Sequence, residues 1–332
     1  MRHKDSRKIN LILMILLLAV SVFSLTLGQY PVGFAKIICS FTSQTHLTAI
    51  DKHILLDIRL PRVLLAIGVG GLLAFSGAIL QGVFHNPLVD PHIIGVSSGA
   101  AFGGTLAILL GFSTFGLMLN TFFFGLLALA LIYLLASLFG QSDRLMLILL
   151  GIVLSGIFAA LVHLVQYLAD TEEKLPNIVF WLLGSFSTAN WQKLGLVWIP
   201  IVIFGGVLYK LRWRINILSL GDIEAKALGL HVTPLRYCVL FLSALLIASQ
   251  VAVTGAVGWI GLVVPHIGRL LVGADHRKLL GTTFLAGAII MLLVDDLART
   301  LSQSEIPLSI ITALFGAPLF IFLLAKNKSW RK

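Results

Sequence analysis

A stripe of polar and small side chains interrupts one long apolar run, residues 145–168. Ser155, Ala159, His163 and Gln166 follow one another at steps of four, four and three residues, so a helix would place them on one face. Polar groups inside a membrane span are costly to bury and by default indicate a functional site. The stripe is therefore a candidate site, and the alternative is that His163 bonds a neighbouring helix.

Residues for other kinds of chemistry are missing from the sequence. The histidines are scattered among span ends and gaps without an H-E-x-x-H motif, so we expect no catalytic residue and no metal site. No G-x-x-x-x-G-K-[ST] loop is present, so ATP would have to be hydrolysed by another protein. Every Asp and Glu lies at a span end or in a gap, which disfavours an ion-coupled secondary transporter. That class and an intramembrane enzyme stay as less favoured alternatives.

Apolar runs of about 15–25 residues, the length of membrane helices, occupy most of the chain. Charged residues make up 11% of the sequence, against about 25% in soluble domains. We expect one all-α polytopic membrane domain over residues 1–332. The ten expected helices are 9–28, 61–83, 93–111, 115–139, 145–168, 190–209, 235–256, 258–272, 279–300 and 306–325.

The positive charge is concentrated at the termini and in every second gap, for example at Arg2, Lys210 and Arg277. The positive-inside rule then places both termini in the cytoplasm. The net charge of +10 is explained by this topology and by contact with anionic lipid, so no nucleic-acid role is expected. Residues 29–58 form the longest outer loop.

A short motif recurs at an offset of 178 residues. Ser76-Gly77-Ala78-Ile79 precedes Pro87, and Thr254-Gly255-Ala256-Val257 precedes Pro265 at the same distance. The two copies lie on the second and seventh spans, which must run in opposite directions. This predicts an inverted repeat, as in many transporters; chance similarity in a chain rich in small residues is the alternative.

The inner gap 211–236 contains an amphipathic helical segment. Asp222 and Glu224 follow Gly221 in its first turn, where acids interact well with the helix dipole. Gly229 stands where a C-terminal cap belongs. The segment suits a groove on a partner protein, or alternatively the lipid surface. Its apolar face consists of Ile223, Ala227 and Leu228.

Cationic residues mark the outer face. Pro61 is favourable in a first helical turn, which places Arg62 near the positive end of the dipole, at a cost of roughly 0.3–1 kcal/mol. A carboxylate from elsewhere is therefore expected near Arg59 and Arg62. Arg299 lies at the end of the ninth span, one turn after Asp295, so the two are expected to pair as i and i+4. Snorkelling to the membrane interface is the alternative for these arginines.

Ordered motifs extend from about residue 55 to residue 325. They are Arg59-Leu60-Pro61-Arg62, Ser76-Gly77-Ala78, Gln81, Asn86-Pro87-Leu88-Val89-Asp90-Pro91, Gly95-Val96-Ser97-Ser98-Gly99-Ala100, Gly261-Leu262-Val263-Val264-Pro265-His266, Asp275-His276-Arg277, Glu305-Ile306-Pro307 and Gly316-Ala317-Pro318. Together they resemble the FecCD family, the membrane subunits of type II ABC importers for iron-siderophores, haem and cobalamin.

The resemblance implies a ten-helix type II ABC importer permease, not itself an enzyme, in a bacterial or archaeal plasma (inner) membrane. It implies a homodimer or a heterodimer with a paralogue, two cytoplasmic subunits that bind ATP and Mg²⁺, and an extracytoplasmic substrate-binding protein. No cofactor is implied in this chain.

The resemblance also implies roles for the candidate residues. Arg59, Arg62 and Arg299 would pair with glutamates of the binding protein, although the added Asp296 competes for Arg299. The segment from Gly221 to Leu230 would be the coupling helix that contacts the ATPase. The stripe on residues 145–168 would line the translocation path at a dimer axis, followed by a short helix at Pro176–Phe186.

The family's cargo leaves the substrate open. Its members carry iron chelates, haem or corrinoids, and some carry molybdate or tungstate. The modest polarity of the stripe favours a large metal chelate, with an oxyanion as the alternative.

Overall fold

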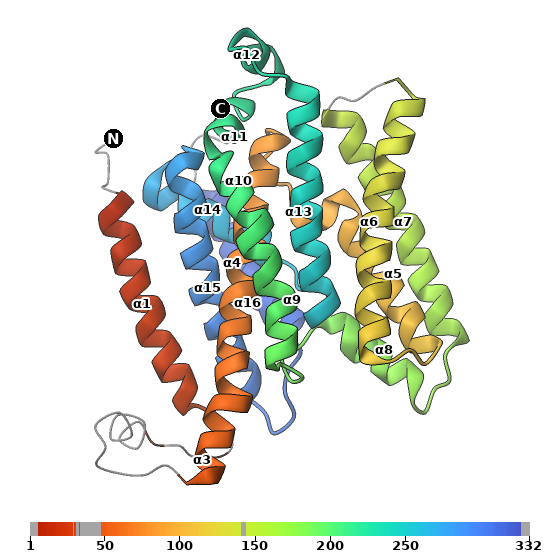
Figure 1. The fold of residues 1–332 in the computed structure, drawn as a ribbon, viewed down its shortest axis with the longest axis vertical. Helices are drawn as coiled ribbons and strands as arrows, with labels where there is room; N and C mark the ends of the chain where they lie inside the picture. Colours follow the sequence, from red (N-terminus) through yellow and green to blue (C-terminus); the bar gives the residue numbers. More distant parts are fainter. Residues whose placement is uncertain (1–5, 29, 31–32, 34–47, 141–143, 327–332) are drawn as a thin grey trace.

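The computed structural model describes residues 6–28, 30, 33, 48–140 and 144–326. Within these ranges all regular structure is helical, and the helices stand side by side in an elongated bundle (Figure 1). The helices are α1 (Ser6–Thr26), α3 (Ala49–His53), η1 (Ile54–Arg59), α4 (Leu60–Val83), η2 (Pro91–Ile94), α5 (Val96–Leu109), α6 (Thr114–Leu138), α7 (Arg144–Leu168), α8 (Lys174–Leu183), α9 (Trp191–Pro200), η3 (Ile201–Gly205), α10 (Gly206–Lys210), α11 (Arg212–Leu218), α12 (Asp222–Ala227), α13 (Val232–Thr254), α14 (Ile260–Val272), α15 (His276–Thr300) and α16 (Leu308–Lys326).

The ten expected apolar segments are all helical, but they differ in length. Seven described helices are long and apolar enough to cross a membrane. With 14 and 13 residues, α5 and α14 are only about 20 Å long, against a hydrocarbon core of about 30 Å. The apolar part of α16, Leu308–Leu323, is also short. The ten expected segments are therefore seven long helices and three shorter apolar ones, α5, α14 and α16.

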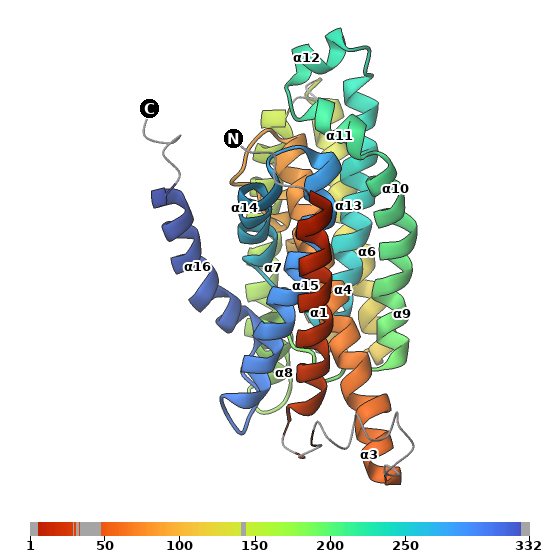
Figure 2. The ribbon, with the colours of Figure 1, turned by 90° about the vertical axis from the view of Figure 1, so that its left-hand side faces the viewer.

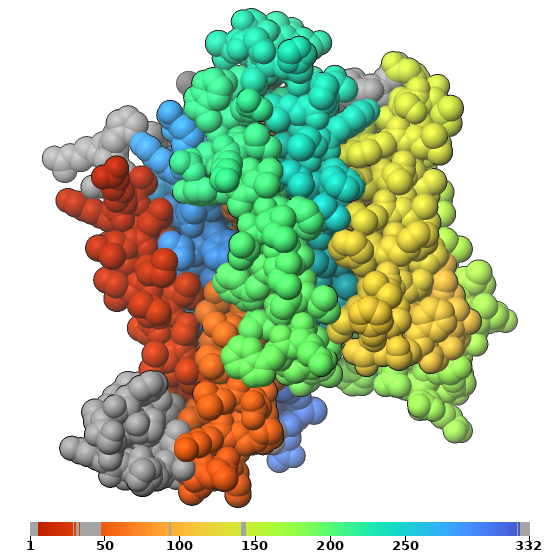
Figure 3. Space-filling view, viewed as in Figure 1, coloured from red at the N-terminus to blue at the C-terminus, as the bar shows by residue number. Residues whose placement is uncertain are grey.

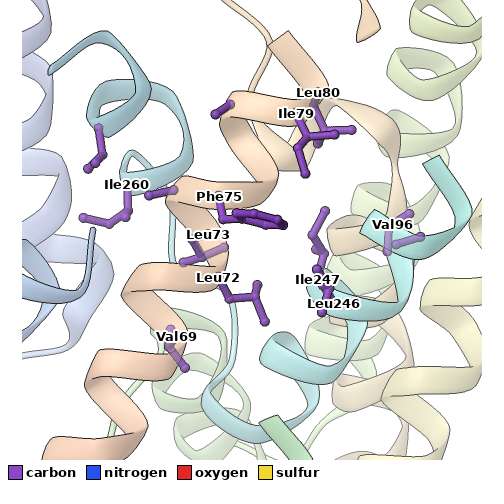
Figure 4. Close-up of a cluster of buried hydrophobic side chains, with 14 of the residues drawn as sticks. Val69, Leu72, Leu73, Phe75, Ile79, Leu80, Val96, Leu246, Ile247 and Ile260 are labelled. Carbon is purple, nitrogen blue, oxygen red and sulfur yellow. The ribbon is translucent and has the colours of Figure 1, made fainter. Parts of the chain in front are cut away.

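Helix α4 forms the centre of the bundle. The most apolar stretch of its continuous helix is 89% buried, against 83% in α13, 72% in α15 and only 11% in α1. Side chains of α4 such as Leu72 and Phe75 point toward Leu246 and Ile247 of α13 (Figure 4). Because lipid gives no hydrophobic reward for helix contact, this centre depends on close packing.

Glycines allow the central helices to touch through their backbones. A Cβ atom on Gly70 would lie 2.3 Å from the Gly287 carbonyl oxygen of α15, and one on Gly287 would lie 2.3 Å from that of Gly70. A Cβ on Gly77 would lie 1.9 Å from the Gly261 carbonyl oxygen of α14. Small residues therefore permit close backbone packing at these crossings.

The two halves of the chain repeat one order of helices: a long helix, a short one and two further helices, α4–α7 and α13–α16. The first helices of the two sets run in opposite directions (Figure 1). The motif pairing was wrong in local detail, because Ser76–Ile79 lies inside α4 whereas Thr254 ends α13. Pro87 lies between α4 and η2, whereas Pro265 lies inside α14.

The outer loop ends earlier than expected. Helix begins at Ala49 and continues without interruption through η1 into α4, so residues 49–58 do not belong to a loop. Pro61 is accommodated because η1 is a π-helix, in which Leu60 N–H already bonds Leu55 O. The rest of the expected loop lies mostly outside the described residues. The start of α1 and the end of α16 point toward the end of the bundle that carries α12 (Figures 1 and 2).

Candidate functional site

At the end of the bundle opposite α12, a buried ion pair joins α4 and α15. Arg62 donates from Nη2 to Asp295 Oδ1 at 2.8 Å and from Nε to Oδ2 at 3.0 Å. It also donates from Nη1 to Glu305 Oε1 at 2.6 Å. The Asp295 side chain is fully buried and that of Arg62 is 10% exposed. The carboxylate expected near Arg62 is therefore supplied by the chain itself.

Arg299 and Arg59 form hydrogen bonds at the same end of the bundle. Arg299 pairs with Asp296 and donates to the carbonyl oxygens of Ser24 and Leu27, at 2.6 and 2.8 Å. Arg59 donates to Leu25 O at 2.7 Å and to Tyr30 O. The expected Asp295–Arg299 contact is long, 3.8 Å, because Asp295 is occupied by Arg62.

This cluster changes the electrostatic argument for the outer face. Since α4 is preceded by η1 and α3, Arg62 does not lie at a free positive helix end, so the dipole argument was wrong. Carboxylates already neutralise Arg62 and Arg299, whereas the partners of Arg59 are neutral carbonyl groups. The role of these arginines in docking stays a prediction. Arg59 has no carboxylate partner, but it is buried, 5% exposed.

The amphipathic segment folds as the short helix α12, which projects from one end of the bundle (Figures 1 and 2). Gly221 has φ 136°, and Gly229 has φ 80°, which favours glycine. Leu230 N–H bonds Ala225 O at 3.0 Å and Gly229 N–H bonds Lys226 O at 2.9 Å, the pattern of a Schellman cap. The expected C-terminal cap at Gly229 is confirmed.

One side of α12 is anchored and the other is open. Asp222 accepts hydrogen bonds from Arg236 at 2.6 and 2.7 Å and lies 3.3 Å from Arg144 Nε, while Ala225 is fully buried. On the opposite side the described part of the chain leaves the apolar face uncovered: Ile223 is 81% exposed, Leu228 is 58% exposed, and Ala227 and Glu224 are exposed. The helix is thus held firmly while it presents an apolar surface.

The stripe on α7 faces away from the bundle. Leu150, Leu154 and Phe158 are buried against neighbouring helices, whereas Ala159 and His163 are exposed. His163 Nδ1 lies 3.1 Å from Gln166 Oε1 in the same helix. This hydrogen bond does not join His163 to a neighbouring helix, as the alternative reading required.

Ser155 and Gln166, the two ends of the stripe, are half-buried. Ser155 Oγ is a buried atom with no hydrogen-bond partner among the described residues. Gly95, the left-handed turn (φ 74°) between η2 and α5, lies beside it, since an added Cβ there would be 3.7 Å from Ser155 Oγ. The stripe therefore begins at Ser155, beside the turn between η2 and α5, and continues to the exposed surface of α7 at Ala159 and His163.

A polar link that was not expected from the sequence joins α4 and α14 to the irregular segment 84–90. Gln81 donates from Nε2 to Val89 O at 3.1 Å and accepts from Arg269 Nη2 at 2.7 Å. His266 Nε2 lies 2.9 Å from Pro87 O. These bonds satisfy backbone carbonyl groups that helix breaks expose at membrane depth. Pro87 lies in the break after α4, whereas its partner on α14 lies 179 residues away in the sequence.

Comparisons with known proteins give the family. The model of the FecCD transport family matches residues 16–326. The chain belongs to the FecCD transport family. It is 52% identical to the molybdate import system permease protein MolB of Haemophilus influenzae over 95% of both chains. It is 39% identical to the hemin transport system permease protein HmuU of Yersinia pestis over 96% of both.

A solved structure agrees with this FecCD assignment. A metal-chelate type ABC transporter in an inward-facing conformation superposes with a TM-score of 0.89 at 52% identity, covering 96% of this chain and 99% of that one. The expected fold class is thus confirmed: an all-α, multi-pass membrane protein built like ABC transporter permeases.

The described residues also bear on metal binding and on nucleophilic catalysis. Among the described residues no three His, Cys, Asp or Glu side chains group as metal ligands; the absence of a cofactor stays a prediction. Residues 95–99 of this FecCD chain also spell G-x-S-x-G. Ser97 is 2% exposed and follows a 3-10 helix, not a strand, so the context of a nucleophile elbow is not met.

Proposed function

We propose that this FecCD protein is the membrane-spanning permease subunit of a binding-protein-dependent ABC importer. The observation that carries the proposal is α12, a capped helix anchored through Asp222 whose apolar face is exposed at one end of a membrane bundle. Such a face needs a protein groove outside the membrane. The chain has no phosphate-binding loop, so the matching partner would be a pair of cytoplasmic ATPase subunits that bind ATP and Mg²⁺.

The importer would contain two permease subunits. Exposed His163 on a membrane span cannot face hydrocarbon at low cost, so a second copy or a water-filled path must cover it. The surrounding surface of α7 is apolar, with Ile152 54% and Ile157 51% exposed, and suits contact with another copy. Ser155, Ala159, His163 and Gln166 would then line a path at the dimer axis.

We favour an oxyanion of the molybdate or tungstate class as the substrate. The relative whose name includes molybdate is 52% identical, whereas the hemin permease is 39% identical. A metal chelate remains the second candidate, because the superposed structure is described as of metal-chelate type. The stripe contains no carboxylate, so it would not repel a dianion.

Transport by the reconstituted complex tests both parts of the proposal. The permease, its ATPase and its binding protein would be placed in proteoliposomes and supplied with labelled molybdate, tungstate, haem or ferric siderophore. We expect ATP-dependent uptake of molybdate and tungstate. Uptake of a chelate without uptake of either oxyanion would identify the chelate as the substrate. If the ATPase subunits never associate with the permease, the proposal of an ABC importer is refuted.

A further inference from the structure

An apolar groove of about 780 Å³ opens on the surface of the bundle. It lies between α1 and the α9–η3–α10 column, with α4 and α15 at its floor, and Figure 3 shows its opening between α1 and α10. We call it the α1–α10 groove. The side chains that give it its apolar character include Leu11, Met14, Phe75, Val202, Phe284 and Leu285.

Glycines keep the walls of the groove open. A Cβ on Gly206 would meet nothing within 4 Å, and one on Gly281 would meet only Asn10 Nδ2, at 3.7 Å. Gly206 begins α10, which directly follows the π-helix η3 in the chain. Such distortions of a helix are frequently found at functional sites. The space is therefore formed by backbone geometry and by small residues, while larger side chains lie around it.

The length of the groove identifies the kind of occupant. On α1 it extends from Arg7 to Met14, about 10 Å along the helix axis, which fits within one leaflet of a hydrocarbon core about 30 Å thick. A transmembrane helix of a partner would need a groove across both leaflets. An acyl chain of a lipid from one leaflet needs only this length.

The polar groups of the groove gather at one end. Arg7, Asn10 and Tyr209 line the end nearest α12, and the Arg212 guanidinium lies 4.2 Å above the Tyr209 ring. The flanking segments 6–10 and 206–214 contain five Lys or Arg and no Asp or Glu. This end would meet the headgroup region, where basic clusters between membrane helices attract anionic lipid.

We propose that the α1–α10 groove is a binding site for an anionic phospholipid of the α12-side leaflet. One acyl chain lies along the glycine wall, and the phosphate lies beside Arg7 and Arg212. The lipid ties α1, the least buried of the long helices, to the bundle. The site lies outside the candidate path and does not depend on which substrate is carried.

Retention of lipid by the purified permease–ATPase complex tests the site. Complexes would be equilibrated in mixed micelles of phosphatidylglycerol and phosphatidylcholine, washed, and analysed for bound lipid by native mass spectrometry. We expect wild type to retain phosphatidylglycerol in preference. Gly206→Leu with Gly281→Leu fills the groove and should remove most of it. Gly195→Leu is the matched control, since its added Cβ meets only Ile199 Cδ1 at 3.9 Å.

A second variant removes the charge without filling the space. Arg7→Gln with Arg212→Gln should reduce the preference for phosphatidylglycerol to that for phosphatidylcholine while one lipid stays bound. Equal retention by wild type and by the filled variant, in complexes that remain assembled, would mean ordinary boundary lipid and would overturn the proposal. Retention of a protein in place of lipid, or an unchanged headgroup preference in the charge variant, would overturn it as well.

Discussion

Removing the charge of Arg62 should destabilise the permease strongly. The Asp295 side chain is fully buried and accepts hydrogen bonds from Arg62 Nε and Nη2. Breaking a buried pair by removing one partner costs about 3–5 kcal/mol, because the other charge stays in a medium of low dielectric constant. Arg62→Met keeps most of the side-chain volume, so the loss should come from the charge. The remaining Arg299 Nε at 3.8 Å places the expected cost near the lower end, about 3 kcal/mol.

The companion substitutions separate charge from packing. Arg62→Met with Asp295→Leu removes both charges and should recover most of the stability, since apolar replacements of buried pairs are often neutral. Glu305→Gln should cost at most about 1 kcal/mol, because the Glu305 side chain is 36% exposed. Lys52→Met, at an exposed cation on α3, is the control and should stay within about 0.5 kcal/mol of wild type.

Equilibrium unfolding in mixed micelles with increasing denaturing detergent measures these differences. The stabilising role of the buried pair is refuted if the free energy of unfolding of Arg62→Met lies within about 0.5 kcal/mol of that of wild type. It is also refuted if the double variant is as unstable as the single one. In that case Arg62 would be available for docking, as its proposed role with the binding protein requires.

Four further expectations concern coupling, docking, the path and packing. Ala227→Glu, on the exposed face of α12, should leave folding intact but uncouple ATP hydrolysis from uptake, since an unpaired carboxylate at an interface costs several kcal/mol; Lys226→Gln is the control, and normal transport by Ala227→Glu would reject the coupling role. Arg59→Gln should weaken binding-protein docking and lower its salt sensitivity, whereas Lys52→Gln should not; equal affinities at low salt would contradict this. Single cysteines at Ser155, Ala159 and His163 should react with water-soluble thiol reagents in a nucleotide-dependent way, and Ala159→Trp should block uptake in complexes that still hydrolyse ATP; cysteines unreactive in every state would place the path elsewhere. Gly77→Ala should abolish stable folding, because its Cβ would lie 1.9 Å from Gly261 O, while Gly195→Ala should be neutral or stabilising by up to about 1 kcal/mol; thermal unfolding of both variants checks this.

The helical class and the amphipathic segment around α12 were predictable because their signals are local. Apolar runs long enough to span a membrane indicate helices wherever they occur. The opposite directions of α4 and α13 follow from counting the spans between them. The helix α12 was recognised from acids in its first turn and from Gly229, whose left-handed conformation few other residues adopt readily. Each of these features depends on neighbours within a few residues.

The tertiary structure alone determined which distant groups meet. Arg62 and Asp295 are 233 residues apart, and the i,i+4 rule had assigned Asp295 to Arg299, which is its neighbour on the helix surface. Burial decided differently, because the bidentate geometry of Arg62 compensates a desolvated carboxylate better than one contact at 3.8 Å. The short lengths of α5 and α14 and the α1–α10 groove have the same origin. They arise where backbones separated along the chain approach or fail to approach, and hydropathy along one segment carries no information about that distance.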